Sequence, residues 1–186
     1  MNLALADVRA AAERIRGRVR RTPVIELAHE ELHPTGSLWL KLEYLQHTGS
    51  FKPRGAFNRI LKAAEDGELP AAGVIAASGG NAGLGVAYAA HHIGVRARVF
   101  VPETAPRVKV EKLRKLGAEV VQTGQIYNDA YQAAVHESER TGALFCHAYD
   151  QPEVCAGQGT LGLELLDQVQ DIDTVLVAVG GGGLLA

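Results

Sequence analysis

From Gly73 onward the sequence alternates short apolar runs with longer segments in which apolar residues recur at helical spacing. The apolar runs lack polar alternation, so they predict strands that are buried on both faces. The segments between them are about 10–15 residues long, which is typical of crossover helices between parallel strands. We therefore predict an α/β fold on an open parallel sheet. The expected elements are strands 74–77, 97–101, 119–122 and 143–146 and helices 82–92, 108–116 and 128–141.

The flanking parts of the chain show the same two kinds of pattern. An amphipathic helix is expected between Leu3 and Val19, followed by an extended segment before a buried strand at Leu38 to Leu42. A further helix is expected to begin near Asp150 as its cap and to end near Val169. The last predicted strand is Thr174 to Val179.

The composition indicates a soluble globular chain with small-molecule partners. It has 186 residues, 47% hydrophobic content and a net charge of −2, without a basic run of five residues. We therefore expect no nucleic-acid partner and no membrane partner, and the absence of a signal-peptide pattern favours a cytoplasmic location. Cys146 and Cys155 lack metal-ligand or CxxC spacing, so we expect buried free thiols.

One short stretch, Thr48 to Ala56, places a lysine at the start of a predicted helix. Gly49 and Ser50 favour a turn and a helix cap, and Pro53 suits the first helical turn, where its missing N–H needs no partner. The positive helix terminus and partial burial both lower the pKa of an amine, and a neutral amine can attack a carbonyl. Lys52 is therefore a candidate nucleophile; the alternative is an ordinary solvated helix lysine.

Two glycine-rich segments follow predicted buried strands. Ser78 to Gly83 follows strand 74–77, and its glycines, hydroxyl and amide suit a carboxylate or a ring oxygen. Gly180 to Gly183 follow strand 174–179 and can present backbone N–H groups to a phosphate without an obstructing Cβ. Each segment alone also fits a plain turn, with Asn81 as a helix cap in the first case.

Open α/β sheets bind ligands at the carboxyl ends of their strands, where these three segments are expected to meet. A reactive lysine, a phosphate site and a carboxylate site are what a pyridoxal phosphate enzyme acting on amino acids requires. A strand and a glycine turn of this kind should lead into a helix, but only residues 184–186 follow. We therefore expect the chain to be part of a longer protein.

Four segments resemble the fold-type II pyridoxal phosphate enzymes and, within them, the threonine/serine dehydratases (ammonia-lyases). They read, in chain order, KLEYLQHTGSFKPRGAFN, SGGNAG, GQGTLGLEL and VGGGG. The resemblance extends over nearly the whole chain and implies the tryptophan synthase β-like fold of two open parallel-sheet domains. Residues 73–148 would form the small inserted domain, and residues 1–72 and 149–186 an incomplete large domain.

The resemblance also implies the roles of individual residues. Lys52 would form a Schiff base with pyridoxal 5'-phosphate, Phe51 would pack beside its ring, and Asn81 would bond the ring hydroxyl. Ser78 would act with Lys52 in the catalytic set by binding the substrate carboxylate. The implied substrate loop is Ser78, Gly79, Gly80 and Asn81. The implied phosphate site is Gly180, Gly181, Gly182 and Gly183.

The chain departs from many relatives at two positions near this loop, where Gly79 and Ala82 replace a serine and a histidine. The serine resembles the opposite-face base of serine racemases, so its absence argues against racemisation. The metal site and the partner of the pyridine nitrogen lie beyond residue 186 in relatives, and we expect no metal ligand here.

The resemblance thus implies a lyase that converts L-threonine or L-serine to a 2-oxo acid and ammonia by β-elimination. For the complete protein we expect a homodimer. Three related activities remain alternatives: a serine racemase, a threonine synthase and a cysteine synthase, with the run around Lys52 arguing against the synthases. A non-catalytic, cofactor-binding remnant is a fourth alternative.

Overall fold

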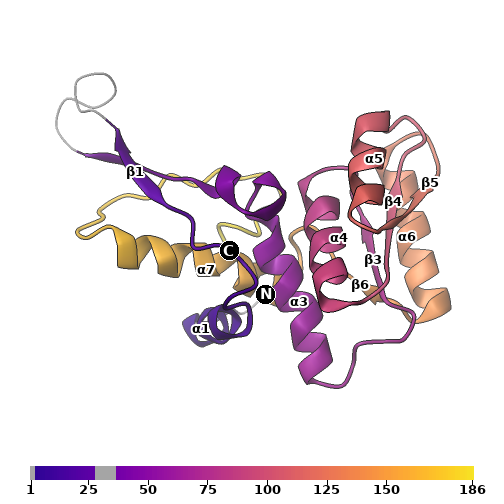
Figure 1. Cartoon of the computed structure of the whole chain (residues 1–186), viewed down its shortest axis with the longest axis horizontal. Coiled ribbons are helices and arrows are strands. Elements are labelled where there is room, and N and C mark those ends of the chain that lie inside the picture. The colour runs from indigo at the N-terminus through magenta and orange to yellow at the C-terminus, as the bar shows by residue number, and fades with distance from the viewer. Residues whose placement is uncertain (1–2, 28–36) are drawn as a thin grey trace.

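A computed structural model of the chain describes residues 3–27 and 37–186. The structure is an α/β fold in which a four-stranded sheet with its covering helices lies beside a second group of helices (Figure 1). All four sheet strands are neighbours in the order β5-β4-β3-β6 and run parallel. Their bounds are β3 Val74–Ala77, β4 Ala97–Val101, β5 Glu119–Gln122 and β6 Leu144–Phe145.

The expected parallel sheet is thereby confirmed, and three of its four strands have the predicted bounds. The register pairs Val74 with both Ala97 and Leu144, and Val99 with Val120. Every residue of β3 is buried, which explains why its sequence shows no polar alternation.

Helices cover both faces of this sheet, as the sequence pattern predicts. One face packs against α4 (Asn81–Ile93) and α5 (Arg107–Lys115), and the other packs against α6 (Tyr127–Thr141). Figure 1 shows α6 behind the sheet and α4 and α5 in front of it. The two faces form separate apolar clusters, so the sheet is the middle layer of three.

The second group of helices consists of α1 (Leu5–Arg14), α3 (Lys52–Glu65) and α7 (Pro152–Gln168). Helix α3 lies between α4 and α7, and glycines allow these helices to approach closely. A Cβ added at Gly157 of α7 would lie 2.5 Å from the carbonyl oxygen of Arg54, and one added at Gly55 would lie 2.7 Å from that of Val154. At these two points the backbones of α3 and α7 are in contact, and no side chain fits between them.

A buried network of charges fixes the start of α3. The guanidinium of Arg54, which is fully buried, donates to both carboxylate oxygens of Glu43 at 2.7 and 2.8 Å and of Glu164 at 2.7 and 2.9 Å. Lys41 also donates to Glu164 at 2.7 Å. Burial opposes the charge of Arg54, but the two carboxylates outweigh it and raise the pKa of the guanidinium.

A strand forms where one was predicted at Leu38 to Leu42, but the prediction that this strand is buried is wrong. The segment forms β2 (Leu38–Lys41), which pairs antiparallel with β1 (Val24–Leu27) in a two-stranded ribbon. Trp39 and Leu40 are 38% and 41% exposed. Apolar side chains are buried in a strand only where another layer covers them, and this ribbon extends away from the sheet (Figure 1).

The expected strand Thr174 to Val179 is also wrong, because residues 172–179 form no regular secondary structure. Leu176 is 86% exposed, and Val175 and Val179 are also exposed. An apolar run becomes a strand only when a neighbouring strand pairs with its backbone, and none in the described part of the chain does. The segment therefore runs as an irregular trace, yellow in Figure 1.

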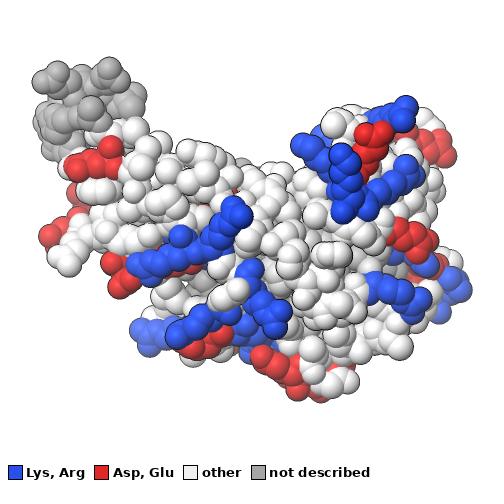
Figure 2. Space-filling view, viewed as in Figure 1, with Lys and Arg blue, Asp and Glu red and all other residues white. Residues whose placement is uncertain are grey.

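Two observations concern the partners that the composition argues against. No helix in residues 3–27 and 37–186 has the length and apolar content needed to cross a membrane. Figure 2 shows Lys and Arg side chains gathered over α5, whose sequence is RVKVEKLRK. The rest of the face drawn there carries both signs of charge.

We predict that Gly157→Ala destabilises the protein, because its Cβ would overlap the backbone of α3. Overpacking of this kind lowers the free energy of unfolding by about 1–3 kcal/mol. Gly162→Ala is the matched control, since a Cβ at Gly162 of the same helix meets no atom within 4 Å. It should raise the free energy of unfolding by about 0.5–1 kcal/mol through helix propensity. Urea denaturation measures both, and equal losses would contradict the close contact.

Candidate active site

The local backbone places Lys52 at the first position of α3. Thr48, at φ 63°, and Gly49, at φ 78°, both adopt the left-handed conformation and turn the chain sharply before the helix. Pro53 follows in the first turn, as expected. The predicted Ser50 cap is wrong: Phe51 occupies the cap position, and the Ser50 hydroxyl is buried without a hydrogen-bond partner among the described residues.

The Lys52 amine points into the interface between α3, α4 and α7. Its Nζ donates a hydrogen bond of 2.7 Å to the carbonyl oxygen of Ala148 and lies 4.9 Å from the centroid of the Phe51 ring. A cavity of about 10 Å³ adjoins it. The cavity is lined by Lys52, Ala56, Ala82, Val86, Cys146, His147, Ala148, Val154 and Gln158. Burial lowers the pKa of Lys52, and Cys155 opposes this only in part.

Gln158 of α7 adds a second polar group to this cavity. Its side chain is fully buried, and its Oε1 has no hydrogen-bond partner in the part of the chain that the structure describes. Its Nε2 lies 3.5 Å from the same Ala148 carbonyl oxygen that accepts from Lys52. Buried amide oxygens are rarely unpaired in proteins, so this acceptor is available to a group that enters the cavity.

The loop from Ser78 to Gly83 joins β3 to α4, and its Ala82 lines the same cavity as Lys52. The Ser78 hydroxyl accepts the backbone N–H of Gly80 at 3.1 Å, and a Cβ at Gly83 would lie 1.9 Å from the Ser78 carbonyl oxygen. Asn81 is exposed and is the first residue of α4, so it is not the helix cap; Gly80 is. Gly79 and Gly80, which lie between Ser78 and Asn81 in the chain, are half-buried.

Two of the four glycines at the other predicted segment, Gly181 and Gly183, pack against Tyr149. An added Cβ would lie 2.3 Å from the Tyr149 ring at Gly181 and 2.6 Å from its carbonyl oxygen at Gly183, whereas at Gly180 and Gly182 it would meet nothing within 4 Å. Tyr149 directly follows Ala148, the acceptor for Lys52. The glycines are thus joined to the lysine through neighbouring residues of one turn.

That turn, residues 147–150, was not identified from the sequence. His147 Nδ1 accepts the backbone N–H of Tyr149 at 3.2 Å and of Asp150 at 2.8 Å. Asp150 is not the α7 cap that the sequence suggests, because Gln151 occupies that position. His147 is the second residue after β6, so the rule that sites lie at the carboxyl ends of parallel strands is the signal that identifies it.

The cysteines are free and buried, which confirms the prediction. Burial raises the pKa of Cys146 to about 12, so its thiol stays protonated at neutral pH. Cys155 donates from Sγ to the Tyr149 carbonyl oxygen at 2.9 Å. Among the described residues, no three His, Cys, Asp or Glu side chains are grouped so as to hold a metal ion.

A family profile described as pyridoxal-phosphate dependent enzyme matches residues 15–186 of the chain. The chain belongs to this family. Among curated relatives, the L-threonine ammonia-lyase of Geobacter sulfurreducens is 47% identical over 96% of this chain and 44% of its own length. The chain spans about half the length of the curated relatives it matches.

Two solved structures of this pyridoxal-phosphate dependent family share the fold. A threonine deaminase from T.th. is 42% identical, with a TM-score of 0.85 over 98% of this chain and 58% of that one. Maize serine racemase is 34% identical, with a TM-score of 0.92 over the whole of this chain and 56% of that one. Both likenesses confirm the fold-type II architecture.

The residues around Lys52 fit the cofactor of the family. The site offers a primary amine with a lowered pKa and the unpaired buried amide oxygen of Gln158 beside it. At Gly180 and Gly182 an added Cβ would meet nothing within 4 Å, so the glycine segment has free space on that side. A cavity of about 10 Å³ holds roughly one water molecule, so a ring-sized ligand requires the surrounding elements to separate.

We predict that the Lys52 amine reacts with an acylating reagent at a lower pH than an ordinary lysine. Burial makes its charged form less stable, so the neutral form persists to lower pH. Competitive labelling across pH, read by peptide mass spectrometry, measures this. The same lysine in the urea-unfolded chain is the control, and an identical midpoint in both states would contradict the prediction.

Proposed function

We propose that the protein deaminates a β-hydroxy amino acid, L-threonine or L-serine, to a 2-oxo acid and ammonia. The observation that carries this proposal is the half-buried Lys52 amine, which donates to the Ala148 carbonyl oxygen beside Ala82 of the first glycine-rich segment. Gly181 and Gly183 of the second segment pack against Tyr149, the residue after Ala148. The names of the curated relatives, L-threonine ammonia-lyase and L-threonine dehydratase, support the same reaction.

In this proposal the cofactor, bound through Lys52, would stabilise the negative charge that develops at the substrate Cα. Phe51 would pack beside its ring, Asn81 would bond the ring hydroxyl, and Gly180 to Gly183 would bind the phosphate. Ser78 and the rest of its loop bind the substrate carboxylate. When the substrate amine displaces Lys52 from the cofactor, the freed Lys52 amine, whose pKa is lowered by burial, would be the base that removes the Cα proton.

The same proposal divides the chain into a small domain at 73–148 and a partial large domain at 1–72 and 149–186. Its support is that the whole four-stranded sheet lies within 73–148, whereas α1, α3 and α7 pack on one another. A homodimer and a cytoplasmic location are part of the proposal for the complete protein.

Racemisation is the second candidate, and the structural likeness to maize serine racemase favours it. It needs a proton donor on the face of the substrate opposite the lysine, whereas elimination needs one base and a leaving group. Gly79 supplies no side chain at that position. We therefore favour elimination.

We predict that Lys52→Ala abolishes the covalent link to pyridoxal 5'-phosphate. Intact-mass analysis after borohydride reduction should show one cofactor adduct on the unaltered protein and none on the variant. Lys62→Ala is the matched control, because Lys62 lies on the same helix and pairs with Asp66 at the surface. An adduct of equal yield on Lys52→Ala would remove the basis of the proposal.

The reaction outcome separates the two candidates. L-Threonine and L-serine should give 2-oxobutyrate and pyruvate with ammonia, and the recovered substrate should stay L. The variant Gly79→Ser tests whether the missing side chain at this position is what prevents racemisation. The new Cβ would lie 3.4 Å from Val101, an ordinary contact, so the variant should fold. Its hydroxyl should make D-serine detectable. Chiral chromatography of partly reacted L-serine measures both. D-serine forming on the unaltered protein as fast as pyruvate would overturn the proposal.

A further inference from the structure

The turn at residues 147–150 connects the two parts of the proposed site. On one side its Ala148 carbonyl oxygen accepts the hydrogen bond of the Lys52 amine. On the other, Tyr149 packs against Gly181 and Gly183. The position of this turn therefore affects both the lysine and the glycines.

The His147 side chain stabilises the turn by accepting hydrogen bonds from two of the turn's own backbone N–H groups. Its Nδ1 lies 3.2 Å from the backbone nitrogen of Tyr149 and 2.8 Å from that of Asp150, and both backbone nitrogens can only donate. Nδ1 must therefore be the unprotonated acceptor of a neutral imidazole. A proton on Nδ1 would place a third donor against two others, and both hydrogen bonds would be lost.

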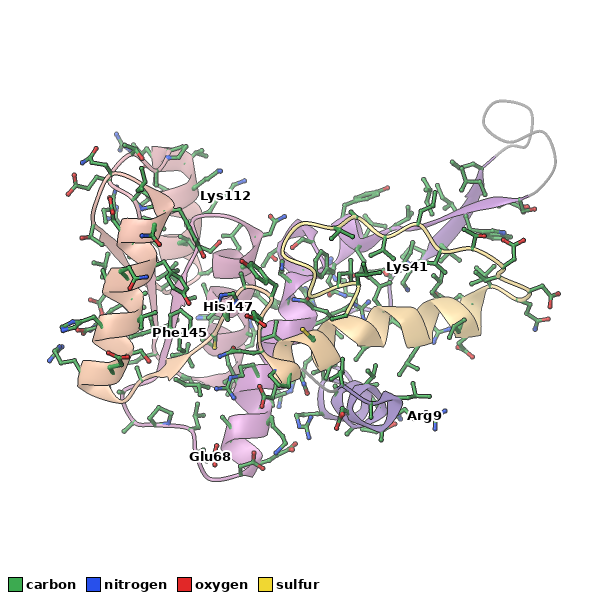
Figure 3. All side chains as sticks on the ribbon, turned by 180° about the vertical axis from the view of Figure 1, so that it is seen from behind. Arg9, Lys41, Glu68, Lys112, Phe145 and His147 are labelled. Carbon is green, nitrogen blue, oxygen red and sulfur yellow. The ribbon has the colours of Figure 1, made fainter. Side chains whose placement is uncertain are left out.

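Aromatic neighbours fix the orientation of this imidazole. The ring packs edge-on against Tyr131 of α6 at a centroid distance of 5.9 Å and against Tyr149 at 4.6 Å, with Phe145 at 6.3 Å. Figure 3 shows His147 beyond Phe145, where the chain leaves the sheet toward α7. The ring is thus held in the orientation that its two hydrogen bonds require.

We propose that His147 is a positioning residue, whose neutral imidazole holds the 147–150 turn so that the Ala148 carbonyl fixes the Lys52 amine. This rests on the proposed function, in which that amine is the reactive group. Lysine amines on long side chains sample several rotamers, so a fixed acceptor reduces the entropy that is lost when the amine reacts.

The charged and titratable groups around His147 set the direction of its pH dependence. They are Lys52 from α3, Tyr131 from α6, Cys146 in the same cavity, and Tyr149 and Asp150 within the turn. Burial lowers the pKa of His147, Lys52 lowers it further, and Asp150 opposes both. The neutral form therefore persists at neutral pH, and the turn should loosen only on acidification below about pH 6.5.

The test compares His147→Leu, which removes the acceptor, with His147→Asn, whose Oδ1 can accept from the same two N–H groups. His136→Asn on the exposed surface of α6 is the control. The first readout is amide hydrogen exchange of Tyr149 and Asp150 in the protein without cofactor. His147→Leu should lose their protection and His147→Asn should keep it. Acidification should reduce it in the unaltered protein but not in His147→Asn.

The second readout is the rate of the covalent reaction with pyridoxal 5'-phosphate. His147→Leu should slow it about five- to tenfold, the scale of one net hydrogen bond, and His147→Asn should restore it. Unchanged amide protection in His147→Leu, or lost protection with an unchanged rate, would overturn the inference. An unaltered protein that forms no covalent link would instead overturn the proposed function, and amide exchange would still decide whether His147 holds the turn.

Discussion

The buried guanidinium of Arg54 is the interaction on which the rest of this structure depends. It joins Glu43, before α3, to Glu164, at the far end of α7. Removing one partner of such a buried pair costs about 3–5 kcal/mol, because the remaining charge is left without compensation. Only one rotation of α3 about its axis lets Arg54 reach both carboxylates. The network therefore specifies the direction in which every other residue of the first helical turn points.

Lys52 points away from those carboxylates for the same reason. Successive helical residues are about 100° apart around the axis, so Lys52 and Arg54 lie on nearly opposite sides of α3. The carboxylates of Glu43 and Glu164 are occupied by Arg54 and Lys41, and no carboxylate of the described residues contributes to the pKa of Lys52. An amine that is buried without a carboxylate partner loses charge easily. The fully paired cation Arg54 and the cation Lys52, which has no carboxylate partner among the described residues, are thus only two residues apart in sequence.

The sequence was a good guide where local pattern decides the structure and a poor one where tertiary neighbours do. Strands such as 74–77 are apolar throughout because both faces are covered, so their bounds were predictable. The run 174–179 looks the same in sequence but forms no strand, because pairing depends on a partner elsewhere. In the site, Lys52 and the glycines are recognisable as motifs. His147 makes its hydrogen bonds within a turn that matches no motif, and only its position just beyond the carboxyl end of β6 points to it.

The contact between α4 and the start of α3 has a mechanical consequence. A Cβ at Gly85 would lie 3.0 Å from the carbonyl carbon of Lys52, so no side chain separates the two backbones. Protein interiors are close-packed and have low compressibility. Between Gly85 and the Lys52 carbonyl group there are also no flexible side-chain atoms that could absorb a displacement. A displacement of α4, which is packed on the sheet, must therefore move the backbone of Lys52 by a similar amount. Motion of the sheet layer is therefore transmitted directly to the backbone of Lys52.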